Sequence, residues 1–319
     1  MCIKIMEQEM EYIYAVYREG SISKAADKLF ITQPALSMAI KRVEKRLGEA
    51  LFDRSQTPIC LTGVGDLYIR KYHEIKHLER ELSNQIHDLQ QSQKGELTIG
   101  GTHFILSYVL APVLSKFFRQ YPDISVKFFE CRADTAESLL IEGSIDTYLR
   151  CDGCPPALKP IGPAFTDHLL IAVHKDYVKR YNLPKENFTH EMIQNNAYFH
   201  DGCFNVDFKH FSKLPYLVPS EGNNSRRRFF DLFSQHKVKP DVRMEVEQLA
   251  TAYYLADNGI GAALASTIMI KKNLGHNLVF YKIKSPILVR HFYFAGRHNG
   301  YISKATSKFM GMLSNYYEE

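Results

Sequence analysis

The most regular pattern of apolar and polar positions in the chain begins just after residue 32. At about 100° per residue, one arc of this segment carries only apolar side chains: Leu36, Ala39, Ile40, Val43 and Leu47. Thr32 suits an N-cap, and Pro34 suits the first turn, where its missing N–H costs nothing. The pattern therefore predicts a helix from Gln33 to Leu47 that buries this arc and turns the other one outward.

A shorter helix is expected to begin near Ser23 and to pack closely against the longer one. Ala25 and Ala26 are small, so two helices can cross tightly there, as a helix-turn-helix requires. Residues 5–18 predict one more helix before this pair, and residues 52–61 suit a short β-ribbon, or wing, after it. The outward arc of the longer helix carries amide, hydroxyl, methyl and ammonium groups, which can read base edges in a major groove. On pattern alone, an ordinary pair of amphipathic helices is the alternative.

From residue 63 to about residue 92, apolar side chains recur at spacings of three and four, with charged residues between them. The apolar positions are Tyr68, Tyr72, Ile75, Leu78, Leu82, Ile86 and Leu89. This spacing is typical of a coiled coil. A helix of about 28 residues would span about 42 Å, and its apolar stripe is too thin for a helix that stands alone. We expect residues 63–92 to pair two chains, although a helix lying across its own domain is the alternative.

The rest of the chain, after a polar break at residues 90–95, alternates strand and helix patterns. The expected strands are residues 97–100, 125–130 and 145–149, with helices at 105–118 and 136–142 between them. A loop over residues 155–165 is expected to lead into a second such set, which runs from residue 168 to about 266. Closing strands at 278–283 and 291–294 and a terminal helix at 303–317 complete the pattern. Alternation of this kind predicts a parallel sheet with covering helices.

Composition narrows the class of protein. A chain of 319 residues with 45% hydrophobic residues can hold more than one globular domain. The net charge of +5 is a weak signal, and residues 1–62 contain nine Lys/Arg and eight Asp/Glu. The basic side chains of that segment gather late, however: Lys41, Arg42, Lys45, Arg46 and Arg54. Phosphate contact depends on where the charge lies, so this late cluster is the informative part.

The N-terminal sequence resembles the DNA-binding domain of LysR-type transcriptional regulators. The residues that carry the resemblance are Ala25-Ala26, Gln33-Pro34-Ala35, Ser37, Glu44, Leu47-Gly48, Leu51-Phe52, Arg54 and Leu61-Thr62. Two positions depart from the family pattern: Met38 stands where a basic or amide side chain is common, and the wing has Ser55 and Gln56 after its single Arg54. The resemblance implies a winged helix-turn-helix over residues 1–62 and a dimerising linker helix over residues 63–93.

Residues 94–319 resemble the effector-binding domain of the same family, which is built like a two-lobed periplasmic solute-binding protein. The matching residues are Leu97-Thr98-Ile99-Gly100, Phe118, Tyr121-Pro122, Leu140, Glu142-Gly143, Ile145-Asp146 and Asp257–Leu264. The resemblance implies lobe I over about 95–163 and 267–319 and lobe II over about 164–266. The chain would then cross between lobes near residues 162–165 and 265–268.

The resemblance also assigns the DNA-binding residues. Gln33, Pro34 and Ser37 would lie nearest the bases, Met38 and Lys41 share their outward arc, and Thr32, the expected N-cap, is also in the DNA-binding set. The expected phosphate contacts are Ser23, Arg42 and Arg54. Two chains paired through the linker helix would bind double-stranded DNA at a dyad-symmetric operator, and such dimers pair again into tetramers in this family.

A small-molecule site is expected where the first strand of the effector domain ends. In open α/β sheets the ligand crevice lies at the carboxyl ends of strands, and Gly101-Thr102-His103 follows such an end. Glycines let the backbone approach an anion, and a helix N-terminus offers free N–H groups. Arg150 could bind a carboxylate, and the facing lobe would contribute Phe199 and His200 at the end of a strand and Ser225 at a helix start. A plain strand–helix turn, and a surface role for Arg150, are the alternatives.

Other classes of protein fit poorly. No apolar leader or membrane span is visible, which predicts a cytoplasmic protein with mostly reduced cysteines. The sequence lacks the spacings of common hydrolase, metalloprotease and nucleotide-binding motifs, so we expect neither an enzyme nor a cofactor or metal. Cys151 and Cys154 have CxxC spacing without a second pair. Cys203 falls close to the expected pocket, which leaves a regulator switched by cysteine oxidation as an alternative to one that binds a small anionic metabolite.

Overall fold

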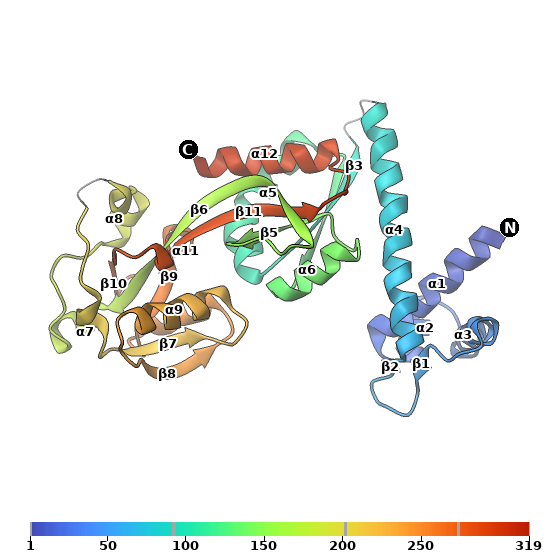
Figure 1. Cartoon of the computed structure of the whole chain (residues 1–319), viewed down its shortest axis with the longest axis horizontal. Coiled ribbons are helices and arrows are strands. Elements are labelled where there is room, and N and C mark those ends of the chain that lie inside the picture. Colours follow the sequence, from blue (N-terminus) through green and yellow to red (C-terminus); the bar gives the residue numbers. More distant parts are fainter. Residues whose placement is uncertain (1, 91–93, 201–202, 273–274, 319) are drawn as a thin grey trace. The chain divides into compact units, whose positions relative to one another are not determined.

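The computed structural model describes residues 2–90, 94–200, 203–272 and 275–318, with side chains from residue 8 onward. Figure 1 shows the chain as a helical N-terminal part and a larger α/β part. By internal contacts it divides into two compact units: Met1–Ser83 with Glu142–Ser144, and Asn84–Ile141 with Ile145–Glu319. Each unit is described by itself below.

The first unit is a winged helix-turn-helix followed by a long helix. Its elements are α1 (Cys2–Glu19), α2 (Ile22–Lys28), α3 (Gln33–Leu47), the short antiparallel strands β1 (Phe52–Asp53) and β2 (Cys60–Leu61), and α4 (Gly63–Leu89), whose last turn belongs to the second unit. The predicted helix from Gln33 to Leu47 is confirmed, including its cap: Thr32 Oγ1 accepts the Ala35 N–H at 3.3 Å. The core of this unit joins Ile13 and Val16 of α1 to Leu36, Ile40 and Val43 of α3.

One position of the predicted apolar arc is wrong. Leu47 is 44% exposed, whereas Leu36, Ile40 and Val43 are fully buried and Ala39 is nearly so. Leu47 is the last residue of α3, and Gly48 turns the chain away with a left-handed φ of 78°. Leu47 therefore lies at the capped C-terminal end of α3, where its side chain stays exposed.

The second unit contains a mixed sheet of seven strands. Along it the order is β10-β6-β11-β5-β3-β4, with β9 also paired to β6. The strands are β3 (Gly95–Gly101), β4 (Ile124–Glu130), β5 (Thr147–Cys151), β6 (Leu158–His174), β9 (Ala263–Ser266), β10 (Leu278–Tyr281) and β11 (Val289–Arg297). Only β4, β3 and β5 are parallel; β11 runs antiparallel to both β5 and β6. The expected all-parallel sheet is therefore replaced by a mixed one.

Helices cover both faces of the β3–β4–β5 portion (Figure 1). The π-helical segment η1 (Ile105–Leu110), α5 (Ala111–Gln120) and α12 (Lys304–Glu318) contribute to one core, which contains Leu97, Ile99, Phe117, Phe294 and Phe309. On the other face α6 (Ala133–Ile141) packs Ala136 and Leu140 against Tyr148. The predicted helices of this portion, and the terminal helix, are confirmed in kind.

The predicted loop over residues 155–165 is wrong, because most of it belongs to β6. Pro160 and Pro163 lie within this strand, although proline cannot donate to a ladder and is confined to strand edges or bulges. In the structure Pro163 pairs with Tyr293 and Pro160 with Ala295, each beside a shift of register. The two bulges accommodate the prolines, so the strand continues through them.

Beyond His168 the partners of β6 change to β9 and β10. This half of the second unit also contains a separate parallel pair of strands, β7 (Pro215–Pro219) and β8 (Asp241–Val246). Helices surround these strands: α7 (Lys175–Arg180), α8 (His190–Gln194), η2 (Ala197–Phe199), η3 (Phe208–Phe211), α9 (Asn224–Gln235), α10 (Leu249–Asp257) and α11 (Thr267–Lys272).

The chain returns to the first half of β6 later than predicted. We expected the second crossing near residues 265–268, but α11 and β10 follow β9 on the same side, and β10 pairs with residues 171–174 of β6. Val279 and Tyr281 of β10 are buried in the core around β7 and α9. The return therefore runs through η4 (Pro286–Leu288) into β11.

Candidate functional site

The outward arc of α3 is the candidate DNA-reading surface. Thr32, Gln33, Pro34 and Lys41 are exposed, Met38 is 63% exposed, and Ser37 is half-buried. On the opposite side of α3, Leu36, Ile40 and Val43 form the core with α1 and α2. The structure thus leaves this predicted set of side chains facing away from the core, on a helix held rigidly by its other face.

The side chains predicted to contact phosphates differ in their exposure and in their ion pairs. Ser23 and Arg42 are exposed, and Arg42 lies 3.8 Å from Glu9. Arg54 instead pairs with Glu44 at 2.9 Å, and the other carboxylate oxygen of Glu44 accepts the Leu51 N–H at 3.0 Å. Glu44 on α3 therefore binds both Arg54 and the backbone just before β1, and the Arg54 guanidinium is already paired with a carboxylate.

The linker helix α4 exposes only the later part of the apolar stripe that its sequence pattern predicts, because Tyr68 and Tyr72 pack within the first unit. Tyr72 is 6% exposed and contacts α1, since its ring stacks on Tyr14 at 4.6 Å. Farther along, Ile75, Leu78, Leu82, Ile86 and Leu89 are 37%, 63%, 59%, 44% and 84% exposed. An apolar stripe that stays exposed on a helix of 27 residues is suited to pairing with a second helix.

The second unit contains a cavity of about 890 Å³. Four helical segments begin at its wall. Thr102 and His103 precede η1, Ala133 opens α6, Asn224 opens α9 and Leu249 opens α10, and all of these residues line the cavity. Each helix N-terminus carries a partial positive charge, so the backbone makes this cavity favourable for an anion. At the start of α9, Asn223 Oδ1 already accepts the Ser225 N–H at 2.9 Å.

The side-chain charges of the cavity nearly cancel. It is lined by six carboxylates, from Glu130, Asp134, Glu137, Asp152, Glu221 and Glu247, and by five arginines, Arg132, Arg150, Arg226, Arg227 and Arg290. Several of these neutralise one another. Arg132 lies 3.8 Å from Asp134, and Arg150 lies 3.1 Å from Glu137.

Four of the seven predicted effector residues line this cavity: Thr102, His103, Arg150 and Ser225. Arg150 is already engaged, since Nη1 donates to Glu137 at 3.1 Å and to the Tyr148 hydroxyl at 3.0 Å. Gly101 is not part of the lining; its carbonyl accepts the Cys131 N–H at 2.8 Å. It ends β3, and a Cβ there would come within 3.3 Å of Ile105 and Phe128.

Phe199 and His200 are a wrong prediction for this cavity, because neither lines it. The predicted strand before them is absent. Thr189 caps the short helix α8, and Phe199 then ends the 3₁₀-helix η2, with its ring 4.7 Å from that of His168 in an edge-to-face contact. The local helical turns carry this segment to the α8 side of β6, where Phe199 is 53% exposed.

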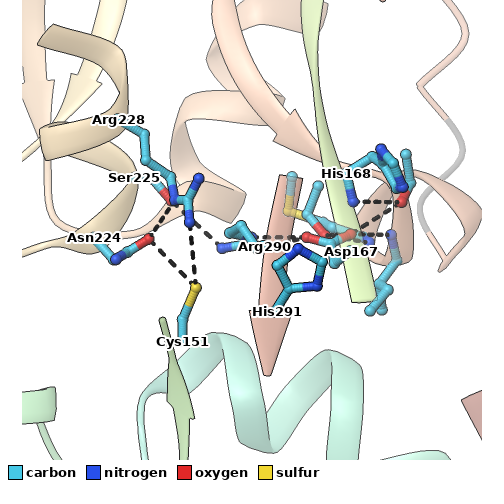
Figure 2. A network of polar contacts seen from close by, with 12 residues as sticks. Cys151, Asp167, His168, Asn224, Ser225, Arg228, Arg290 and His291 are labelled. Carbon is cyan, nitrogen blue, oxygen red and sulfur yellow. Dashed lines mark hydrogen bonds and ion pairs between the residues drawn. The ribbon is translucent and has the colours of Figure 1, made fainter. Parts of the chain in front are cut away.

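The most buried charges of this region could not be predicted from the sequence. Asp167 on β6 and Arg290 on β11 form a buried ion pair, in which Arg290 Nε donates to Asp167 at 2.8 Å. Arg228 on α9 donates to Asp152, to Asn224 at 2.9 Å and to the Ile287 carbonyl. Figure 2 shows both arginines between α9 and the strands, with Cys151 beside Arg228. These residues are far apart in the chain, so only the fold brings them together.

The cysteines near the cavity are shielded thiols. Burial raises the pKa of Cys151 to about 12 and also raises the pKa of Cys131. A thiol held protonated in this way is a poor nucleophile. Within the described ranges, no group of three or more His, Cys, Asp or Glu side chains is placed to hold a metal ion, so the CxxC spacing of Cys151 and Cys154 gains no support as a metal site.

Two family profiles match the chain. Residues 8–66 match the family described as "Bacterial regulatory helix-turn-helix protein, lysR family", and residues 90–317 match the "LysR substrate binding domain". The second match alone covers well over half of the chain. The chain belongs to the LysR family. It is a DNA-binding transcriptional regulator with an effector-binding domain, and not an enzyme.

Relatives of this LysR-family regulator match along almost their whole length. The "Uncharacterized HTH-type transcriptional regulator YcgK" of Bacillus subtilis is 28% identical over 304 residues, which are 94% of this chain and 91% of the relative. A "Probable RuBisCO transcriptional regulator" of Synechocystis is 26% identical over 309 residues, covering 95% of this chain and 84% of the relative.

Solved LysR-family structures share the fold. Full-length CbnR in complex with its target DNA matches with a TM-score of 0.68 at 17% identity, over 97% of this chain and 99% of CbnR. A full-length OxyR variant from Pseudomonas aeruginosa matches with a TM-score of 0.66 at 17% identity, over 98% of this chain and 94% of OxyR. Among the described residues, no helix is both long and apolar enough to cross a membrane.

Proposed function

We propose that this LysR-family regulator acts in the cytoplasm as a dimer on a dyad-symmetric operator and alters its DNA binding when a small anionic effector occupies the cavity of the second unit. In this proposal Gln33, Pro34 and Ser37 read the bases, while Ser23, Arg42 and Arg54 contact phosphates. Gln33, Pro34 and Arg42 are exposed on α3, whose other face is buried against α1 and α2, and this supports the assignment. Ser23 is exposed on α2, and Arg54 follows β1.

The observation that carries the effector proposal is the convergence of four helix N-termini on one cavity. The lining carboxylates and arginines nearly balance, and the partial positive charges of the helix N-termini then favour an anion. A volume of about 890 Å³ suits a small metabolite. Differential binding of such a molecule to two arrangements of the effector domain would shift the balance between them.

The exposed stripe of α4 supports the dimer. Leu78 and Leu82 are more than half exposed on a helix that alternates them with charged residues. Pairing of two such helices buries the stripe and relates two copies of α3 by a two-fold axis. Further pairing of effector domains would give a tetramer.

A thermal-melting screen of the full chain against small metabolites tests the effector proposal. The chain has no tryptophan, so the melting midpoint is a better readout than tryptophan fluorescence. An anionic metabolite should raise the midpoint of the wild type, and Thr102→Val should lose this response while binding operator DNA normally. Thr251→Val, at an exposed position of α10 outside the cavity lining, is the matched control. A response that survives in Thr102→Val would exclude this end of the cavity.

A second candidate is a regulator switched by oxidation of Cys203. One contact favours it: Lys282 Nζ lies 3.2 Å from Cys203 Sγ, and a cation beside a partly buried thiol is typical of reactive cysteines. Mild peroxide should then move the melting midpoint of the wild type but not that of Cys203→Ser. Equal shifts in both proteins would remove this candidate.

A further inference from the structure

Arg290 is a buried cation on the wall of the cavity. It lies on β11, is 3% exposed and belongs to the cavity lining. Its guanidinium lies over the ring of Phe104, 4.8 Å from the centroid, and over that of Phe292, 5.2 Å from the centroid. The two aromatic rings therefore hold the guanidinium in place. Its N–H donors lie in the guanidinium plane and remain available for hydrogen bonds.

One side of this guanidinium is occupied by Asp167. Nε and Nη2 of Arg290 both donate to Oδ2 of Asp167. The other oxygen, Oδ1, accepts from Ser266 Oγ at 2.9 Å, Thr267 Oγ1 at 3.0 Å and the Ile268 N–H at 3.3 Å. Both oxygens of Asp167 therefore accept hydrogen bonds from several donors, and these contacts hold Asp167 and Arg290 in position.

The other side of the guanidinium is nearly unused. A guanidinium has five N–H donors, and in the described part of the chain Nη1 makes one contact, 3.5 Å from Ser225 Oγ. That distance is at the limit of a hydrogen bond. Ser225 is also buried and lines the cavity, in the first turn of α9. Figure 2 shows Arg290 reaching from Asp167 toward Ser225. A buried guanidinium with spare donors on a cavity wall is a site for an oxyanion.

The surroundings of this pair are apolar. Phe104, Phe292, Leu149 and Leu249 line the same cavity and are 8%, 6%, 5% and 6% exposed. The side chains of Arg132, Asp134, Glu221 and Glu247, in contrast, are largely exposed. A ligand whose anion reaches Arg290 therefore places the atoms next to that anion against aromatic and aliphatic carbon.

We propose that Arg290 and Ser225 bind the carboxylate of the effector, and that the effector is an organic carboxylate with an apolar body that contacts Phe104 and Phe292. Asp167 is the positioning residue that holds Arg290. This inference rests on the proposed function, since it names the ligand class of the same cavity. It excludes small hydrated anions, which cannot cover the apolar wall.

Titration calorimetry on the full chain tests the ligand class, with benzoate and hexanoate as carboxylate probes, their neutral amides benzamide and hexanamide, and inorganic sulfate. At least one carboxylate should bind, and its amide should bind at least about tenfold more weakly, because it loses a charge-assisted hydrogen bond. Sulfate should not bind. Equal affinity of acid and amide, preference for sulfate, or no binding of either carboxylate would overturn the inference.

Two variants test the residues. Ser225→Ala should weaken carboxylate binding by about three- to tenfold and leave amide binding unchanged. Ser234→Ala makes the same change on the same helix outside the cavity lining and should bind as the wild type does. The double variant Arg290→Gln with Asp167→Asn removes both charges together, which avoids a lone buried charge, and should abolish the preference for acid over amide.

Thr102→Val separates this inference from the proposed function. Loss of carboxylate binding in Thr102→Val, together with unchanged binding in Ser225→Ala and in the double variant, would keep the effector cavity and overturn the Arg290 assignment. Loss in Ser225→Ala and in the double variant supports both. Binding that none of the three changes would show that the carboxylate lies outside this cavity, and would overturn both.

Discussion

Arg228 and Arg290 are buried side chains that each donate to a carboxylate. Neither pairing was visible in the sequence, because Asp152 and Arg228 are 76 positions apart and Asp167 and Arg290 are 123 positions apart. Residues next to their partners in sequence were easier to predict. Thr32 was identified as the cap of α3 from its neighbours alone, and its hydroxyl accepts the Ala35 N–H. At the residue scale, the sequence therefore predicts local contacts and misses the pairs that tertiary structure creates.

The Asp167–Arg290 pair yields a stability prediction. Asp167→Asn leaves the Arg290 charge buried without its counter-ion, which should lower the free energy of unfolding by about 3–5 kcal/mol. Urea denaturation measures this loss. Asp231→Asn, at an exposed position of α9, is the control and should change the free energy by less than about 0.5 kcal/mol. A loss for Asp167→Asn as small as that of the control would mean that the pair contributes little to stability.

Among whole elements, the N-terminal helices were predicted well and the middle of the chain less well. The period of 3.6 residues is strong in α3 and α4, and both form where the pattern predicts. In contrast, residues 155–165 were expected as a loop, but Leu158 onward belongs to β6, in which two β-bulges accommodate Pro160 and Pro163. Phe199 was expected to end a strand but belongs to a 3₁₀-helix. Bulges and short helical turns depend on partners elsewhere in the chain, so the local pattern does not determine them.

The outward arc of α3 gives a specificity prediction. A glutamine can bind adenine through two hydrogen bonds in the major groove, so Gln33→Ala should remove about 1–3 kcal/mol of discrimination between operator and mismatched DNA. Competition binding with the two duplexes measures it. Lys45→Ala, near the end of the same helix, should leave the discrimination unchanged. Unaltered discrimination in Gln33→Ala would remove this residue from the base-reading set.

The exposed stripe of α4 gives an assembly prediction. Leu82 is 59% exposed within one chain, so Leu82→Arg should leave the melting of a single chain unaffected and act on the dimer. A charge in the seam of a coiled coil should weaken dimerisation by at least about 100-fold. Sedimentation equilibrium measures the change. Glu79→Gln, an exposed position on the same helix, should dimerise normally. A dimer of Leu82→Arg with wild-type affinity would exclude this stripe as the interface.

The whole molecule combines a locally encoded unit with one that depends on long-range contacts. The class of fold, helix α3 and the linker helix α4 could be predicted because each rests on periodicity and on short, specific motifs. The effector cavity could be predicted only in part: Thr102, His103, Arg150 and Ser225 follow from strand ends and helix starts, whereas Arg290 comes from β11, far along the chain. The lobe boundary was placed too early because β10 pairs with β6 before the chain returns.

Selection of DNA sequences from a random duplex pool by the full-length chain tests whether a dimer reads DNA through two copies of α3. A dimer that reads DNA through two copies of α3 should enrich a sequence with two half-sites related by a dyad, centred about one helical turn or a multiple of it apart. Gln33→Ala should lose the same base position in both half-sites. A single asymmetric site, or no enriched sequence from an active preparation, would contradict the account.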